Sequence, residues 1–111
     1  MYVYSVKEAP NRYIVTIINT GNTDANSIKI LCNQGLPANV YIIRLTPGTS
    51  GHGNLSSQSA FIGEQKVNDT TAILNRSLIN HDSVTVVPDG GSYYYIASVP
   101  KGTAAVIKIG Y

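Results

Sequence analysis

The sequence is poor in tryptophan, cysteine and charge. Its 111 residues include no tryptophan and one cysteine, Cys32, and only 13% are charged. A single cysteine cannot form an intrachain disulfide. The net charge is +2 without a cluster of basic residues, so no basic surface for nucleic acid is indicated. No run reaches the roughly 18 apolar residues of a membrane-spanning helix.

Groups that could carry catalysis or hold a metal are also few. His52 and His81 are the only histidines, and no cysteine or histidine pair has the spacing of zinc ligands. No G-x-S-x-G motif is present, so a hydrolase would have to be built on His52 and the serines near it. Turn chemistry explains the aspartates, which all fall at predicted turns: Asp24, Asp69, Asp82 and Asp89. We therefore predict a protein that is not an enzyme and needs no cofactor or metal, with an incidental Ca²⁺ site between loops as the alternative.

Apolar and β-branched residues are abundant. Hydrophobic residues make up 43% of the chain, which excludes a disordered composition. Two β-branched segments, 13–18 and 27–32, flank a link of Asn, Thr, Gly and Asp over 19–24. This pattern predicts a hairpin around which the rest of the chain is organised. Cys32 falls on the apolar face of the second arm, which predicts a buried thiol.

Short apolar or alternating runs predict the other strands. These cover 2–6, expected at a sheet edge, and 40–45, 60–62, 83–87, 92–98 and 104–109. Residues 70–79 fit one helical turn or a strand, and the β surroundings favour the strand. Residues 46–60 are predicted to form a long Gly/Ser/Thr loop. The whole chain, 1–111, is predicted to be one domain, an all-β, Ig-like antiparallel β-sandwich of about seven or eight strands.

Several predicted strands are apolar on both faces. Adjacent apolar pairs occur at Ile14–Val15, Ile42–Ile43, Val86–Val87 and Val106–Ile107. A two-sheet sandwich needs only one apolar face on each sheet. The surplus predicts that a partner chain covers an outer face, the alternative being cover by loops of the same chain.

Three consecutive tyrosines place aromatic rings on both faces of one strand. Tyr93 and Tyr95 share one face, and Tyr94 takes the other. One of these faces belongs to the core, so the other exposes tyrosine, a residue enriched at interfaces. Combined with the apolar pairs, this gives four candidate contact residues: Val86, Val87, Tyr94 and Val106.

Three N-glycosylation acceptor motifs begin at Asn54, Asn68 and Asn75. With so many Asn, Ser and Thr residues, chance alone yields about two such motifs. The motifs therefore permit an extracellular location without establishing it.

Two stretches resemble archaeal cell-surface β-sandwich domains, among them the soluble domains of the archaellum (archaeal flagellum) accessory proteins F and G. The first is Ile17-Ile18-Asn19-Thr20-Gly21-Asn22, and the second is Val86-Val87-Pro88-Asp89-Gly90-Gly91-Ser92-Tyr93. The resemblance implies an Ig-like sandwich outside the cytoplasmic membrane, excised from a longer chain that a hydrophobic N-terminal helix anchors. It also implies self-association, with a dimer favoured, and contact with a surface-layer protein or another accessory subunit. That family has no catalytic residues.

Together these features predict a non-enzymatic, extracellular assembly or anchoring module of the archaeal motility machinery that acts through protein–protein contact. Two alternatives remain open. One is a carbohydrate-binding or adhesin module that uses Tyr93–Tyr95 or the 46–60 loop. The other is a structural subunit of a virus or pilus, which would polymerise instead of stopping at a dimer.

Overall fold

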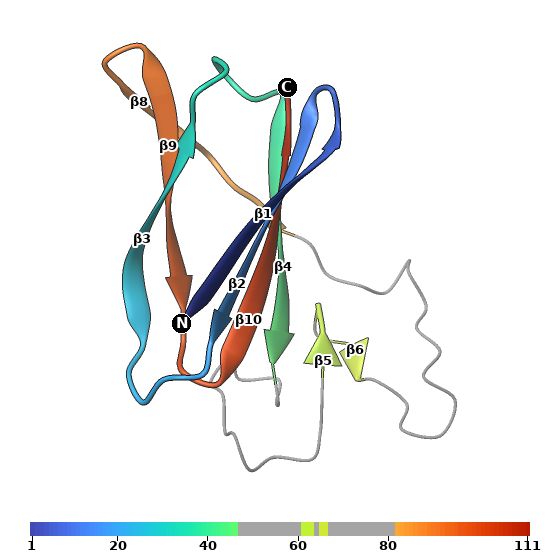
Figure 1. Ribbon diagram of the computed structural model, residues 1–111, viewed down its shortest axis with the longest axis vertical. Helices are drawn as coiled ribbons and strands as arrows, with labels where there is room; N and C mark the ends of the chain where they lie inside the picture. The colour runs from blue at the N-terminus through green and yellow to red at the C-terminus, as the bar shows by residue number, and fades with distance from the viewer. Residues whose placement is uncertain (47–60, 64, 67–81) are drawn as a thin grey trace.

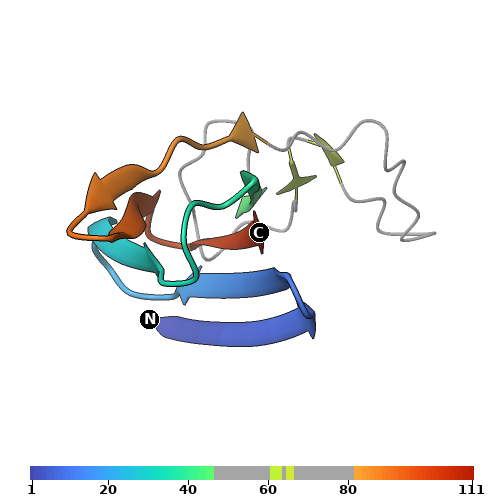
Figure 2. The ribbon, with the colours of Figure 1, turned by 90° about the horizontal axis from the view of Figure 1, so that it is seen from above.

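The computed structural model describes residues 1–46, 61–63, 65–66 and 82–111, and this part of the chain contains strands and turns but no helix. The strands form two antiparallel sheets that lie face to face (Figures 1 and 2). The predicted all-β sandwich is therefore confirmed. No helix long and apolar enough to cross a membrane occurs among the described residues.

The larger sheet has the strand order β1-β2-β10-β4-β5-β6, and β7 also pairs with β4. Its strands are β1 (Tyr2–Ala9), β2 (Arg12–Asn19), β10 (Thr103–Gly110), β4 (Asn39–Thr46), β5 (Phe61–Ile62), β6 (Gln65–Lys66) and β7 (Asp82–Ser83). The smaller sheet has the order β3-β9-β8. Its strands are β3 (Ala25–Cys32), β9 (Ser92–Val99) and β8 (Val87–Asp89).

The core lies between β2, β10 and β4 of the larger sheet and β3 and β9 of the smaller one. Its buried apolar side chains are Ile17, Ile30, Cys32, Val40, Ile42, Ala97, Val99, Ala105, Ile107 and Ile109. In β10 the buried residues alternate with less buried ones, as the period of a half-buried strand predicts. Tyr93 and Tyr95 pack against this core and Tyr94 does not, so the predicted division of the three tyrosines between two faces is confirmed.

The predicted hairpin over 13–32 is wrong. β2 pairs with β1 and β10, whereas β3 pairs with β9, so the link between β2 and β3 is an arch that joins the two sheets. An apolar alternation suits two strands that face each other across a core as well as two strands in one sheet. Asn19 fixes the arch: its Nδ2 donates to the carbonyls of Thr23 and Val99, at 3.0 and 2.9 Å, and its Oδ1 accepts from the Gly21 amide at 3.0 Å.

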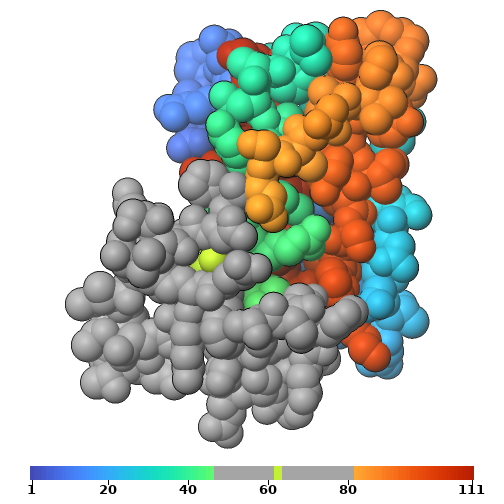
Figure 3. Space-filling model, turned by 180° about the vertical axis from the view of Figure 1, so that it is seen from behind, coloured from blue at the N-terminus to red at the C-terminus, as the bar shows by residue number. Residues whose placement is uncertain are grey.

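The single strand predicted over 83–87 is also wrong. β7 ends at Ser83 in the larger sheet, and β8 begins at Val87 in the smaller one. Between them the chain passes over β4 from one sheet to the other, as the orange segment in Figure 3 shows. Val84 and Val86 both pack against the core during this crossing. The apolar alternation of Val84 and Val86 therefore reflects a segment that crosses between the sheets with these side chains against the core, and not a continuous strand.

Other predicted elements match the structure closely. The strands predicted over 2–6, 40–45, 92–98 and 104–109 correspond to β1, β4, β9 and β10, and the first lies at a sheet edge as expected. The predicted turn after Val87 is a two-residue link, Gly90-Gly91, with φ of 56° and 92°. Some predictions concern residues outside the described part of the chain. These are the loop over 46–60, apart from Thr46, the ambiguous segment 70–79, both histidines and all three acceptor asparagines.

Candidate functional site

The outer face of the larger sheet is apolar across four strands. Residues opposite each other in an antiparallel pair share a face, so the register of β1, β2, β10 and β4 gives three rows on the side away from the core. The rows are Tyr2, Ile18, Ala104 and Leu45; Tyr4, Thr16, Val106 and Ile43; and Val6, Ile14, Lys108 and Tyr41. We call these twelve positions the outer face. Only Lys108 among them is charged.

The outer face arises because three of its strands carry apolar residues at consecutive positions. In β2, β4 and β10, one of each apolar pair points into the core, as with Ile42 and Ile107, and its neighbour points outward, as with Ile43 and Val106. Three of the four apolar pairs predicted from the sequence therefore contribute to this one face, the exception being Val86–Val87. Exposure is greatest on β1, where Tyr2, Tyr4 and Val6 are 55%, 56% and 59% exposed.

Strand β1 is also the edge of the larger sheet. Among the described strands it pairs only with β2, and it contributes no side chain to the core. Val3 and Ser5, which point to the side of the core, are exposed because the smaller sheet ends at β3 and does not extend over β1. Figure 2 shows β1 at the border of the molecule, away from β8 and β9. Both faces and one edge of β1 are thus accessible.

The four candidate contact residues do not form one surface. Val106 lies at the centre of the outer face. Val87 and Tyr94 are opposite each other on the smaller sheet, on the far side of the molecule, and Val86 packs against the core. The sequence analysis did not single out Tyr2, Tyr4 or Val6, although their alternation in the predicted first strand was a usable signal.

The exposed side of the smaller sheet also carries apolar side chains, Leu31, Val87 and Ile96, but its tyrosine is packed by charged neighbours. The Lys29 ammonium lies 4.6 Å from the centre of the Tyr94 ring and 3.2 Å from an Asp89 carboxylate oxygen. An ion pair with Asp89 holds the Lys29 cation over the face of the Tyr94 ring, and such a contact is compatible with a ring exposed to solvent. This surface therefore needs no partner to cover Tyr94.

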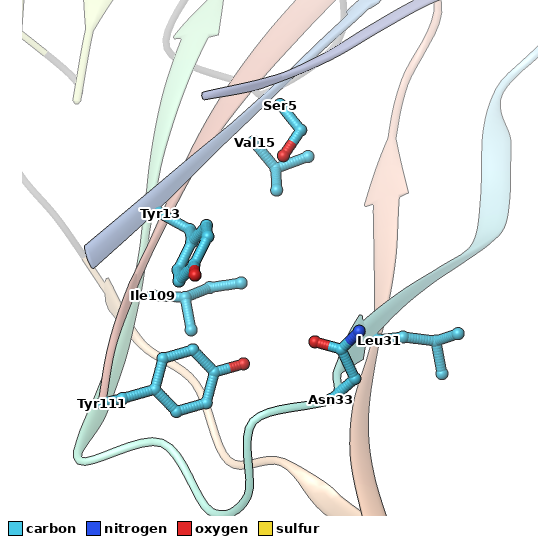
Figure 4. A pocket seen from close by; sticks show the side chains of 7 residues that line it. All are labelled: Ser5, Tyr13, Val15, Leu31, Asn33, Ile109 and Tyr111. Atoms are coloured by element: carbon cyan, nitrogen blue, oxygen red, sulfur yellow. The ribbon is translucent and has the colours of Figure 1, made fainter. Parts of the chain in front are cut away.

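A pocket opens between the two sheets beside β1 (Figure 4). It measures about 250 Å³ and is lined by Ser5, Tyr13, Val15, Leu31, Asn33, Ile109 and Tyr111. The rings of Tyr13 and Tyr111 meet edge to face, 5.9 Å apart, and the Tyr13 hydroxyl accepts a hydrogen bond from the Gln34 amide. The pocket lies on the core side of β1 and β2, where the smaller sheet ends at its edge strand β3.

Burial disfavours ionisation of two groups at this pocket, Cys32 and Tyr111. Burial raises the pKa of the Cys32 thiol above its ordinary value of 9.0, despite a hydrogen bond with Tyr111 that lowers it. Burial, and then the nearby Cys32, raise the pKa of Tyr111 above 10.0. A protonated thiol and a protonated phenol are a poor nucleophile and a poor base. The arrangement therefore suits binding through hydrogen bonds and ring contacts.

The described residues contain no group of three or more His, Cys, Asp or Glu side chains that could hold a metal ion. Their aspartates have other roles: Asp24 accepts from the Lys101 amide at 2.9 Å and so ties the β2–β3 arch to the β9–β10 turn, and Asp89 pairs with Lys29. Comparison with protein-family models, curated proteins and solved structures finds no match for this chain.

Proposed function

We propose that this domain is a non-enzymatic assembly module that self-associates by burying its outer face against a second copy. The observation that carries the proposal is the alignment of apolar side chains over four adjacent strands with a single charge among twelve positions. An antiparallel sheet with a solvated face normally alternates apolar and polar residues. A continuous apolar face with strongly exposed tyrosines is typical of a contact surface.

The size of the outer face sets the strength of this contact. Four strands about 4.8 Å apart and three rows about 6.6 Å apart give a flat area of about 380 Å². Side-chain relief increases the accessible area, yet a stable interface usually buries about 800 Å² on each partner. The face alone therefore supports a weak dimer that depends on protein concentration.

The test is the solution mass by light scattering over a concentration series, with one substitution on each sheet. Val106→Lys places a charge at the centre of the outer face without touching the core, and we expect it to abolish contact through this face and so lower the mean mass. Val87→Lys is the matched control, because Val87 is 46% exposed on the opposite sheet. A wild-type protein that stays monomeric at every concentration, or a Val87→Lys protein that alone loses association, would contradict the proposal.

The location and partners of the module form a finer proposal. An extracellular site of action, an anchor upstream of this sequence, and contact with a surface-layer protein or an archaellum accessory subunit all follow from the resemblance of two short stretches. The outer-face proposal does not depend on them. Expression of the tagged full-length gene product in its native cell, followed by protease treatment of intact cells, would test whether the domain is outside.

A ligand-binding module is the second candidate, and the pocket between β1 and β3 favours it. Ligand sites for drug-sized molecules usually measure about 300–1,000 Å³, so a pocket of about 250 Å³ suits a single sugar ring or one amino-acid side chain. We expect any such ligand to lose affinity in Asn33→Ala, because the Asn33 amide points into the pocket in Figure 4. A glycan array with wild type and this variant separates the two candidates, since Asn33 is remote from the outer face.

A further inference from the structure

The free edge of β1 differs from the other sheet edges in the described part of the chain. Proteins normally protect edges with short strands, proline, charge or bulges. β8 has three residues with Pro88 at its centre, and β6 has two. β3 is long, but its ladder is irregular between Ala25 and Ile28 and carries Lys29 at its middle. β1 pairs regularly with β2 from Tyr2 to Lys7, and both its bulge and its two charged residues, Lys7 and Glu8, lie at the turn end of the strand.

We propose that two copies join edge to edge, with β1 of one copy paired antiparallel to β1 of the second around a two-fold axis. The larger sheet then continues through both copies. The inference rests on the proposed self-association and adds to it a second contact, along the edge of the larger sheet. An unpaired strand edge with apolar side chains is a template for another strand, and an identical strand satisfies it without rearrangement.

The side chains of β1 select the register of this pairing. Opposite residues must lie on the same face, so a shift by one position is excluded. With Ser5 on the two-fold axis, residues 2–8 of both copies pair, and Tyr4 is opposite Val6 of the second copy. Aromatic residues opposite β-branched residues are favourable cross-strand pairs. An axis at Lys7 instead places two lysines opposite each other, and an axis at Tyr4 shortens the paired segment to residues 2–6. An axis at Val6 places Tyr4 opposite Glu8 and brings the irregular end of the strand, between Lys7 and Ala9, into the ladder.

Edge pairing also resolves the small size of the outer face. The two-fold axis is perpendicular to the sheet, so the outer faces of both copies lie on the same side and become continuous. The joined face measures about 760 Å² of flat area, and with side-chain relief its accessible area reaches the roughly 800 Å² per partner of a standard interface. Edge pairing and face contact use different surfaces, so both can form in one assembly.

Cysteine cross-linking tests the register directly. Ser5→Cys places two thiols opposite each other on the axis. Native Cys32 is fully buried, so we expect the reagent not to reach it in the folded protein. The matched control is Ser27→Cys, an exposed serine on β3, the other long edge strand. With a short bis-maleimide, we expect Ser5→Cys to form covalent dimers at least about tenfold faster, because paired strands hold the thiols at a high effective concentration.

The outcomes separate the edge pairing from the proposed function. Fast cross-linking of Ser5→Cys that persists in the Val106→Lys background supports the edge pairing. Slow cross-linking of Ser5→Cys in a protein that still associates by light scattering overturns the edge pairing and leaves the outer-face proposal standing. Faster cross-linking of Ser27→Cys than of Ser5→Cys also overturns it. A wild-type protein that is monomeric throughout refutes the proposed function and the edge pairing together.

Discussion

Replacing Asn19 tests the arch that turns the predicted hairpin into a sandwich. Asn19 is only 4% exposed, and its amide makes the three hydrogen bonds that hold the β2–β3 link against the end of β9. Each bond contributes about 1 kcal/mol net, and a buried partner left without a donor costs more, so Asn19→Ala should lower the free energy of unfolding by about 2–4 kcal/mol. Domains of this size are stable by about 5–15 kcal/mol, so the loss is a large fraction of the total.

The assay is urea denaturation followed by far-UV circular dichroism, with a thermal scan beside it. At roughly 4–8 °C for each kcal/mol, we expect the Tm to fall by about 10–25 °C. Asn22→Ala is the matched control, because Asn22 is exposed in the same arch and should change stability by less than about 0.5 kcal/mol. Equal effects of the two substitutions would refute the assignment of the Asn19 amide to the arch.

Asn19→Asp sharpens the same test, because it keeps the shape and the acceptor for the Gly21 amide. It replaces the donor to the Thr23 and Val99 carbonyls with an acceptor, so only a protonated carboxyl could donate there. Burial and two facing carbonyls raise the pKa of this carboxyl in the folded state above its unfolded value. The protonated form then stabilises the fold, so the variant should lose stability as pH rises from the unfolded pKa through the folded one. A variant whose stability relative to wild type does not change over that range would contradict the geometry.

Three further predictions concern the core, a turn and the buried phenol. Ile107→Ala should lower the unfolding free energy by about 2–5 kcal/mol in urea denaturation, because Ile107 is fully buried at the centre of the core. Gly91→Ala should lower the unfolding free energy by about 1–3 kcal/mol in the same assay, since the φ of 92° at Gly91 strains any residue with a Cβ. Asn22→Ala is again the control and should leave the unfolding free energy nearly unchanged. Burial raises the folded-state pKa of Tyr111 above 10.0, so its protonated form contributes stability that is complete below that pH and is lost as pH rises through the folded pKa. In thermal melts at increasing alkaline pH, the Tm of Tyr111→Phe should therefore fall less steeply with pH than the Tm of the wild type. An identical fall would contradict the burial of this hydroxyl.

The fold class was predictable because strand patterns are local. The alternation of Ala105, Ile107 and Ile109 with their neighbours is set by the backbone of one strand, and the Gly90-Gly91 turn is set by two residues that tolerate positive φ. Both features were found without knowledge of the neighbouring strands. The link between β2 and β3 was not predictable in this way, because a turn-rich segment between two alternating strands fits a hairpin and an arch equally.

The candidate site was half predictable for the same reason. That three strands carry surplus apolar residues was visible in pairs such as Ile42–Ile43, but which surplus residues lie together depends on strand order. Val106 and Ile43 are adjacent only because β10 pairs with β4, although more than fifty residues separate them along the chain. Val87 and Tyr94 have the same sequence signature and lie on the opposite sheet. Long-range pairing therefore decided which of the predicted contact residues share a surface.

The two sheets differ in how their exposed tyrosines are packed, although the smaller sheet also exposes Leu31, Val87 and Ile96. The smaller sheet covers the ring of Tyr94 with Lys29, which Asp89 holds in place, so its aromatic side chain is adapted to water. On β1, Tyr2 and Tyr4 are more than half exposed. Burying such rings releases more water than burying small residues and loses little side-chain entropy. If the exposed tyrosines served solubility alone, Tyr4→Lys would leave the mass and the stability unchanged; loss of association with full retention of the monomer fold would show that they serve contact.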